Sequence, residues 1–252
     1  MPEHLKVEDL NIAIFENRSI MGASAAQMIA TKINELLATQ AIVNIIFAAA
    51  PSQNEVLIAL REKNIDWSRI NAFHMDEYIG LPLDAPQSFG AFLRNILFAH
   101  VGFRSVNYIN GNASDIILEC ERYEALLKAF PTDIVCMGIG ENGHLAFNDP
   151  PVADFKDTQW VKMVDLDLVC RQQQVNDGCF ETLAAVPTQA LTLTIPTLMR
   201  GKHLFCVVPG KTKQQAIYNT LNQNIVELYP STILRTHSNS ILILDEVSAA
   251  LL

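Results

Sequence analysis

Short apolar runs of strand length alternate along this chain with longer segments in which apolar residues recur at helical spacing. The apolar runs lie at 41–49, 70–75, 132–138, 203–208 and 240–245, and the helix-like segments at 52–63, 88–99, 113–129 and 211–221. This alternation indicates βαβ units, in which helices connect parallel strands of one sheet. The pattern therefore predicts an α/β fold with a mostly parallel sheet.

No linker divides the chain. The sequence contains no internal repeat, no low-complexity tract and no stretch rich in Pro, Gly and Ser. We therefore expect a single domain over residues 1–252. Ligands of parallel sheets bind at the carboxyl ends of the strands, so functional side chains should follow the apolar runs rather than precede them.

The first such junction follows the run at 41–49. Ser52 could cap a helix over 52–63, because a serine at the N-cap accepts a hydrogen bond from a free backbone N–H. Leu57, Ile58 and Leu60 would then lie on the inner face of that helix. Free N–H groups and the helix dipole also favour an anion at such a terminus, so Ser52 is a candidate phosphate ligand.

Composition narrows the class of protein. Half of the residues are hydrophobic and 18% are charged, which is typical of a compact globular protein. The formal net charge of −9, without a cluster of Lys and Arg, argues against a nucleic-acid surface. No uncharged apolar stretch approaches the ~20 residues that span a bilayer, and the first ten residues do not resemble a secretory signal. We therefore expect a cytoplasmic protein that binds neither nucleic acid nor membrane.

The five cysteines are widely spaced and include no CxxC pair: Cys120, Cys136, Cys170, Cys179 and Cys206. This spacing favours buried, reduced thiols over a disulfide framework or a zinc site. We therefore expect no metal.

Two adjacent acids follow the run at 70–75, within HMDEYIGL at 74–81. In extended backbone Asp76 and Glu77 point to opposite sides, so only one of them can face a given ligand. A carboxylate in this position could act as a general base that removes a carbon-bound proton. The alternative is a solvated acid or a helix N-cap, which the local sequence alone slightly favours.

A glycine-rich polar loop, MGIGENGHLAFNDPP at 137–151, follows the next apolar run. Gly138, Gly140 and Gly143 permit a tight turn and close backbone approach to a ligand. The loop is not a dinucleotide-binding fingerprint, because Pro150 and Pro151 exclude the helix that should follow it.

His144 lies inside this loop, with potential partners at Glu141, Asn142 and Asp149. An imidazole beside a carboxylate can relay protons, since its unperturbed pKa is ~6.5. A structural histidine that hydrogen-bonds loop backbone is the alternative, but polar, glycine-rich loops at strand ends more often carry function.

Two cations occupy comparable junctions. Arg171 lies near the start of a helical segment, and Lys213 follows the strand at 203–208, which Gly210 ends. Each alone is a weak signal, because a solvated surface cation is commoner. Their position at junctions like that of Ser52 modestly favours a role for all three as phosphate ligands.

Long motifs extend this interpretation: HMDEYIGLP, PQSFGAFLRNILF, INGNASD and GIGENGHLAFNDP, followed by VPTQALTLTIPTL, VVPGKTKQQAI and TILRTHSNSILILDEVSA. In this order, and across nearly the whole chain, they resemble the glucosamine-6-phosphate deaminase/isomerase family. The 6-phosphogluconolactonases of the same superfamily share the glycine loop but usually lack the MDEY segment, so they match less well.

The resemblance implies an open, Rossmann-like, mostly parallel sheet with helices on both faces. It also implies an enzyme that converts a phosphorylated amino sugar to a ketose phosphate and ammonia without a metal or organic cofactor. Asp76 would shuttle a proton between C2 and C1 of the open-chain sugar. His144 would assist ring opening, supported by the acids that flank it. The phosphate would lie against the loop with Ser52, Arg171 and Lys213.

Three departures from the family pattern leave alternatives open. Asn142 replaces a usual aspartate, Asp149 replaces a usual glutamate, and the phosphate loop AAAPSQN contains no glycine. A lactonase-like hydrolase and a weakly active sugar-phosphate sensor therefore remain alternatives. We prefer the deaminase, because Asp76, His144, Arg171 and Lys213 are all retained. The sugar epimer is left open, as is a homo-oligomer.

Overall fold

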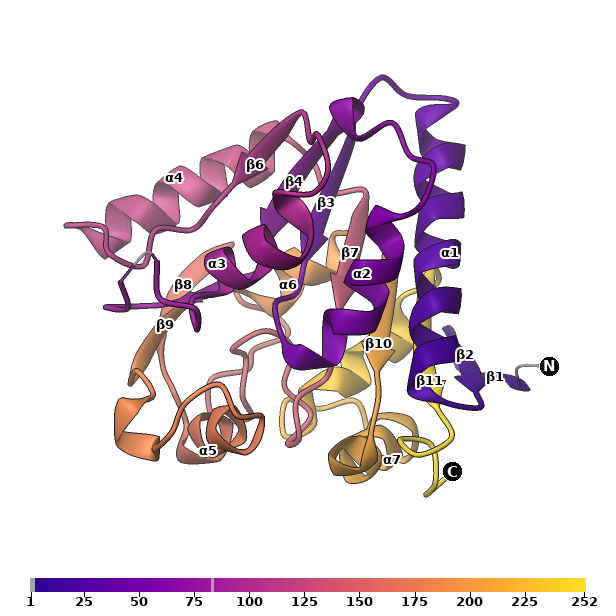
Figure 1. Ribbon diagram of the computed structural model, residues 1–252. Helices are drawn as coiled ribbons and strands as arrows, with labels where there is room; N and C mark the ends of the chain where they lie inside the picture. Colours follow the sequence, from indigo (N-terminus) through magenta and orange to yellow (C-terminus); the bar gives the residue numbers. More distant parts are fainter. Residues whose placement is uncertain (1–2, 83) are drawn as a thin grey trace.

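The computed structural model describes residues 3–82 and 84–252, within which eight strands form one large sheet (Figure 1). The strand order is β1-β2-β11-β10-β7-β3-β4-β6. All neighbouring pairs are parallel except the hairpin of β1 and β2. The strands are β1 (Glu3–Val7), β2 (Leu10–Phe15), β3 (Val43–Phe47), β4 (Ile70–His74), β6 (Ser105–Asn107), β7 (Ile134–Met137), β10 (His203–Val208) and β11 (Ser240–Asp245). The predicted mostly parallel α/β sheet is confirmed.

The central strands coincide with the apolar runs of the sequence. The runs at 203–208 and 240–245 match β10 and β11 at both ends, and the runs at 41–49, 70–75 and 132–138 contain β3, β4 and β7. Every residue of β3, β4 and β7 is buried. A strand covered on both faces reads as a continuous apolar run, which explains why the sequence revealed these strands so clearly.

Helices cover both faces of the sheet, as Figure 1 shows. Successive residues of β3 belong to different cores: Ile45 and Phe47 pack in one hydrophobic cluster and Ile46 in the other. The first cluster contains the buried faces of α1 and α2, and the second those of α4, α6 and α7. The helices are α1 (Arg18–Leu37), α2 (Asn54–Arg61), α3 (Phe89–Leu93), α4 (Ile116–Ala129), α5 (Leu168–Asn176), α6 (Ile195–Met199) and α7 (Gln214–Asn222). None of the helices in the described ranges is long and apolar enough to cross a membrane.

The start of α2 differs from the prediction. Ser52 is not its N-cap: it lies in a short 3₁₀ turn over Pro51–Gln53, and Gln53 precedes the first residue of α2. The inner face is formed by Val56, Leu57 and Leu60, whereas Ile58 is 43% exposed. Val56 therefore takes the predicted place of Ile58 on the inner face, because positions i, i+1 and i+4 lie together on a helix of 3.6 residues per turn.

A second, smaller sheet was not predicted. It contains β5 (Asp76–Tyr78), β9 (Gln189–Leu193) and β8 (Val161–Asp165), in that order and antiparallel throughout. Only Met75 separates β4 of the large sheet from β5 of the small one. The chain therefore passes from one sheet to the other at the position of the acid pair.

Candidate active site

Four neighbouring strands of the large sheet each place one polar side chain at a common pocket. Ser52 follows β3, Asp76 follows β4, His144 follows β7 and Lys213 follows β10, and all four line this pocket. The order β10-β7-β3-β4 brings these carboxyl ends side by side. The expectation that polar candidates follow the strands is thus met for these four residues.

Asp76 and Glu77 have different environments, although both are buried. Asp76 lines the pocket. Glu77 turns the other way and accepts hydrogen bonds from Ser88 Oγ at 2.9 Å and from the backbone N–H groups of Phe89 and Gly90 at 3.0 and 2.8 Å. Glu77 therefore binds the N-terminus of α3, which is the helix-cap role given above as the alternative for this acid pair. Asp76, which lines the pocket, remains the candidate general base.

The carboxyl group of Asp76 favours its neutral form. Burial raises its pKa well above the usual range, and the negative charge of Glu77 adds to this effect. A carboxyl group poised in this way can hold a proton and release it to a bound substrate. A general acid–base group must do both.

His74 holds the backbone on which Asp76 lies. Its Nδ1 donates to the carbonyl oxygen of Asp76 at 2.9 Å, and its Nε2 accepts from the N–H of Ile109 at 2.8 Å. Burial lowers the pKa of His74, more than the nearby charge of Glu77 raises it. The imidazole is therefore neutral, with its single proton on Nδ1. His74 was not among the predicted site residues, although it lies two residues before Asp76 in the same motif.

His144, Asn142 and Asp149 form a connected network, here called the relay. The Nδ1 of His144 lies 2.9 Å from Oδ1 of Asn142 and 3.0 Å from Oδ1 of Asp149. The Nδ2 of Asn142 donates to the same carboxylate oxygen at 2.8 Å. Both neighbours of Nδ1 are acceptors, so Nδ1 carries the ring proton and Nε2 is left as an acceptor.

The charge of Asp149 is stabilised within the relay. Burial acts against the ionised carboxylate, but the positive charge that His144 can carry and the hydrogen bonds from His144 and Asn142 outweigh it and lower the pKa of Asp149. Asp149 thus provides the negative charge that an aspartate at position 142 would have supplied.

Glycine at two loop positions permits this arrangement. A Cβ on Gly140 would lie 2.1 Å from Cε1 of the His144 ring, a distance at which no side chain fits. Gly143 has a φ of +88°, the left-handed region that glycine adopts without strain. Gly138 leaves space for a different side chain, because a Cβ there would lie 3.0 Å from Nε2 of Gln53.

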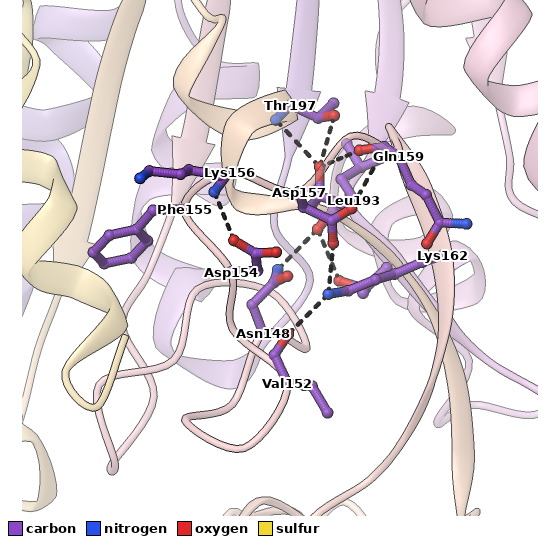
Figure 2. A network of polar contacts seen from close by, with 12 residues as sticks. Asn148, Val152, Asp154, Phe155, Lys156, Asp157, Gln159, Lys162, Leu193 and Thr197 are labelled. Carbon is purple, nitrogen blue, oxygen red and sulfur yellow. Dashed lines mark hydrogen bonds and ion pairs between the residues drawn. The ribbon is translucent and has the colours of Figure 1, made fainter. Parts of the chain in front are cut away.

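A second polar network fixes the loop that carries the relay (Figure 2). Asn148 donates from Nδ2 to the carbonyl of Leu193 in β9 at 2.8 Å. Lys162 of β8 donates to the carbonyl of Val152 at 2.8 Å and forms an ion pair with Asp157, also at 2.8 Å. The small sheet therefore fixes the loop on both sides of the relay carboxylate.

Lys213 provides the positive charge of the pocket. Its side chain is buried, and burial lowers its pKa although the charges of Asp177 and Glu141 act in the opposite direction. Within residues 3–82 and 84–252 its ammonium group forms no ion pair. A buried ammonium without a counter-ion is a strong site for an anionic ligand.

Ser52 lines the same pocket as Lys213, from the end of β3, which β7 separates from β10. Its hydroxyl accepts from Nε2 of Gln53 at 3.2 Å, and the same Nε2 donates to the carbonyl of Val207 in β10 at 3.0 Å. Gln53 therefore ties the loop after β3 to the strand that precedes Lys213. The sequence offered no signal for Gln53, since its partner lies in a distant strand.

Five predicted site residues do not line the pocket: Glu141, Asn142, Gly143, Asp149 and Arg171. Asn142 and Asp149 act on it through His144. The guanidinium of Arg171 donates to the carbonyls of Leu183 and Val186 at 2.7 and 2.8 Å. Glu141 has a buried carboxylate oxygen without a hydrogen-bond partner among the described residues. Helix α5 instead presents Gln173 and Gln174 to the pocket. The start of a helix could be predicted from the sequence, but not which of its side chains would face the ligand.

The chain is similar to several known proteins. A family model described as glucosamine-6-phosphate isomerases/6-phosphogluconolactonase matches residues 16–243. Glucosamine-6-phosphate deaminases of Bacillus thuringiensis (strain Al Hakam) and Bacillus cereus (strain B4264) are each 33% identical over 219 residues, which is 87% of this chain and 82% of theirs.

Solved structures add the comparison of folds. A monomeric glucosamine-6-phosphate deaminase superposes with a TM-score of 0.87 at 29% identity, covering 96% of this chain and 99% of that one. A 6-phosphogluconolactonase of Thermotoga maritima has a TM-score of 0.76 at 21% identity, covering 93% of this chain and 98% of its own. The second likeness shows a shared fold alone.

Proposed function

Because this chain belongs to the glucosamine-6-phosphate isomerase/6-phosphogluconolactonase family, we propose that it converts a hexosamine 6-phosphate to a ketose 6-phosphate and ammonia. The substrate is glucosamine 6-phosphate or a close epimer. The relatives named as deaminases are 33% identical to this chain, whereas the lactonase of Thermotoga maritima is 21% identical. This difference in identity favours the deaminase over the lactonase.

One observation carries the proposal: a carboxyl group, an imidazole and an ammonium group line one pocket, contributed by Asp76, His144 and Lys213. An aldose–ketose isomerisation needs a group that moves a proton between adjacent carbons. Opening the pyranose ring needs a second group that moves a proton between two oxygens. The phosphate needs a cation. The pocket supplies all three.

Ring opening is assigned to His144. Its Nε2 is an acceptor, because Nδ1 holds the ring proton between Asn142 and Asp149. Nε2 can therefore take the proton of the anomeric hydroxyl and return it to the ring oxygen as the C1–O5 bond breaks. The transient imidazolium is stabilised by the carboxylate of Asp149.

Isomerisation is assigned to Asp76. As a carboxylate it removes the proton from C2 of the open-chain sugar and delivers it to C1. In the same step O1 gains a proton and the ammonium group loses one, so that the C1–O double bond is replaced by a double bond between C2 and nitrogen. Water then adds to the C2 iminium carbon, and ammonia leaves. The protonated amine of the substrate offsets the charge of the carboxylate, which favours its ionised form on binding.

The phosphate is assigned to Ser52 and Lys213, with Arg171 as a further ligand. Lys213 needs no rearrangement, since its ammonium forms no ion pair among the described residues. Arg171 would have to exchange the carbonyls of Leu183 and Val186 for phosphate oxygens. Lys213 is therefore expected to contribute the larger share of the binding free energy.

The reaction needs no redox or group-carrying cofactor, because each step is a proton transfer or an addition of water. The five cysteines are free thiols, which fits the reducing cytoplasm. We therefore place the protein there, with a small sugar phosphate as its partner.

Ammonia release tests the proposal directly. The purified protein should release ammonia from glucosamine 6-phosphate or galactosamine 6-phosphate, and hydrolyse 6-phosphogluconolactone slowly or not at all. Faster hydrolysis of the lactone would replace the deaminase with the lactonase. Tight binding of the amino sugars without ammonia would identify a sensor.

A further inference from the structure

A thiol adjoins the relay on its buried side. The Sγ of Cys170, the imidazole of His144 and the carboxylate of Asp149 each offer a ligand atom, and these atoms all lie within 4.8 Å of one another. All three residues are buried, with exposed fractions of 1%, 9% and 2%. Cys170 comes from α5, whereas the other two belong to the loop after β7. The proton transfers assigned above do not use the thiol.

This set of atoms fits a borderline-soft divalent ion. Zinc binds thiolate sulfur at about 2.3 Å and imidazole nitrogen or carboxylate oxygen at about 2.0 Å, in a tetrahedron. Ligand atoms of such a tetrahedron lie on the order of 3–4 Å apart, so the three side chains need only small movements to surround an ion. A thiolate and a carboxylate together balance its two positive charges.

We propose that Cys170, Asp149 and His144 form a binding site for Zn²⁺ that switches the relay off. The ion bonds to Sγ, to a carboxylate oxygen and to Nδ1, and a water molecule from the pocket fills the fourth position. The thiol proton is released to solvent. The Nδ1 proton gives way to the ion, and the neutral imidazole then carries its proton on Nε2. Charge and protons balance, with one proton released for each ion bound.

The inhibitory effect follows from the tautomer. In the free protein Nε2 is an acceptor, whereas with zinc on Nδ1 the same atom is a donor and cannot take the anomeric proton. The carboxylate that stabilises the imidazolium is also occupied. The site itself depends only on the three ligand atoms, so it stands even if the sugar phosphate differs from the one proposed.

Sequence spacing could not reveal this site. Asp149 lies five positions after His144 in the same loop, and Cys170 lies 26 positions after it in helix α5. The three residues form no CxxC or HxxxH pattern. Cys170 meets the relay only because α5 packs over the loop after β7. The spacing argument against zinc therefore applies to a local motif and not to these three residues.

Cobalt provides a readout that is independent of turnover. Co²⁺ should be titrated into the metal-free full-length protein while the absorption spectrum is recorded. The proposal predicts a near-ultraviolet band for charge transfer from thiolate to cobalt, together with the visible bands of a tetrahedral ion. Adding Zn²⁺ should abolish both by displacement.

Two serine variants assign the signal. Cys170→Ser keeps a hydroxyl beside Asp149 but removes the thiolate, so it should lose the charge-transfer band and bind Zn²⁺ more than about 100-fold more weakly, since loss of outer ligands alone costs up to that factor. The matched control is Cys120→Ser, because Cys120 is a half-buried thiol on α4 outside the pocket. It should retain the band and the affinity.

Turnover in the presence of Zn²⁺ completes the test. Zinc should inhibit the wild-type protein reversibly, with activity restored by a chelator, and should inhibit Cys170→Ser far less. Absence of the charge-transfer band in the wild type, or its loss in Cys120→Ser but not in Cys170→Ser, would overturn the site. Because the spectrum is recorded without substrate, a failure of the proposed deaminase activity would leave this result intact.

Discussion

The imidazole of His74 donates a hydrogen bond to the backbone carbonyl of Asp76, at 2.9 Å. It is the peptide of Asp76, and not its carboxylate, that His74 holds. The carboxylate is therefore free to change its charge while the backbone that carries it stays in place. A substitution of this side chain should remove the chemistry and leave the geometry of the pocket.

Asp76→Asn tests this separation. Turnover should fall by roughly 10²–10⁴-fold, the contribution of a positioned general base. Binding of the sugar phosphate should persist, because Lys213 and Ser52 are unchanged. Measurement of kcat together with substrate affinity by calorimetry checks both parts, with Asp9→Asn at an exposed position as the control. Near-native turnover would show that another group moves the proton.

The same substitution should stabilise the protein in a pH-dependent way. The pKa of Asp76 is raised in the folded state by burial and then by Glu77, so the folded protein binds this proton more tightly than the unfolded chain does. Wild-type stability is therefore lost as pH rises from the ordinary aspartate pKa toward the raised one. The Tm advantage of Asp76→Asn should be absent at acid pH and grow through that window, by about 2–4 °C for each 1 kcal/mol. A constant difference in Tm across this range would contradict the assignment.

Glu77→Gln should lower stability and keep turnover, the opposite of the result expected for Asp76→Asn. The carboxylate accepts from Ser88 and from two backbone N–H groups at the start of α3, and an amide would turn a donor toward one of these donors. Loss of hydrogen bonds to a charged group should cost about 2 kcal/mol or more, which lowers Tm by about 4 °C or more. Turnover per folded molecule should be largely kept. A collapse of turnover at an unchanged Tm would place Glu77 in the chemistry.

Lys213→Met should weaken substrate binding about 10–100-fold, the equivalent of one charge-assisted hydrogen bond. Because burial lowers the pKa of Lys213, its removal should also raise Tm slightly. Arg171→Met should weaken binding less and lower Tm, since Arg171 holds the carbonyls of Leu183 and Val186. The KM and Tm values of the two variants show which of the two cations contributes more to substrate binding. A larger KM effect at Arg171 would mean that the guanidinium leaves those carbonyls when the phosphate binds.

The relay makes a directional prediction about pH. Asn142→Asp adds a negative charge beside His144, which favours the imidazolium and should move the limb of the pH–rate profile that reports the imidazole toward higher pH. Asp149→Asn should slow turnover more than Asn142→Ala, because Asp149 carries the only charge of the relay side chains that opposes the imidazolium. Equal tolerance at His144 and Asp149 would indicate that the ring opens by another route, and would favour the sensor.

Gly140→Ala should abolish turnover through His144. A methyl group at this position would lie 2.1 Å from the ring, so the imidazole must leave its place between Asn142 and Asp149. Phosphate binding at Lys213 should change little. Gly102→Ala is the matched control, since its Cβ would meet no atom within 4 Å. Retained activity in Gly140→Ala would show that the position of the ring is not required.

The parts of the fold that could be predicted are those with a local signal. The strands β10 and β11 are buried apolar runs that end in turns, so their limits follow from the sequence. Strand β5 has three residues, and its partner β9 lies more than 100 positions away, so no local pattern marks the small sheet. The hairpin of β1 and β2 and the long helix α1 were not among the predicted elements.

The candidate site divides in the same way. Asp76, His144 and Lys213 follow buried strands, and the rule for parallel sheets brought them together. The orientation of Arg171 depends on the carbonyls at 183 and 186, and the role of Gln53 depends on Val207. Such contacts join segments that are distant in sequence, and periodicity contains no information about them.

The position of β11 sets the order in which this molecule can be made. Strand β11 (Ser240–Asp245) lies between β2 and β10 in the sheet, although it follows every other strand of the described residues in sequence. While the ribosome is still adding residues before 240, the edges of β2 and β10 have no strand between them, and unpaired edges promote aggregation. Completion of the sheet therefore waits until β11 has been synthesised, and premature termination before β11 should yield a chain that depends on chaperones.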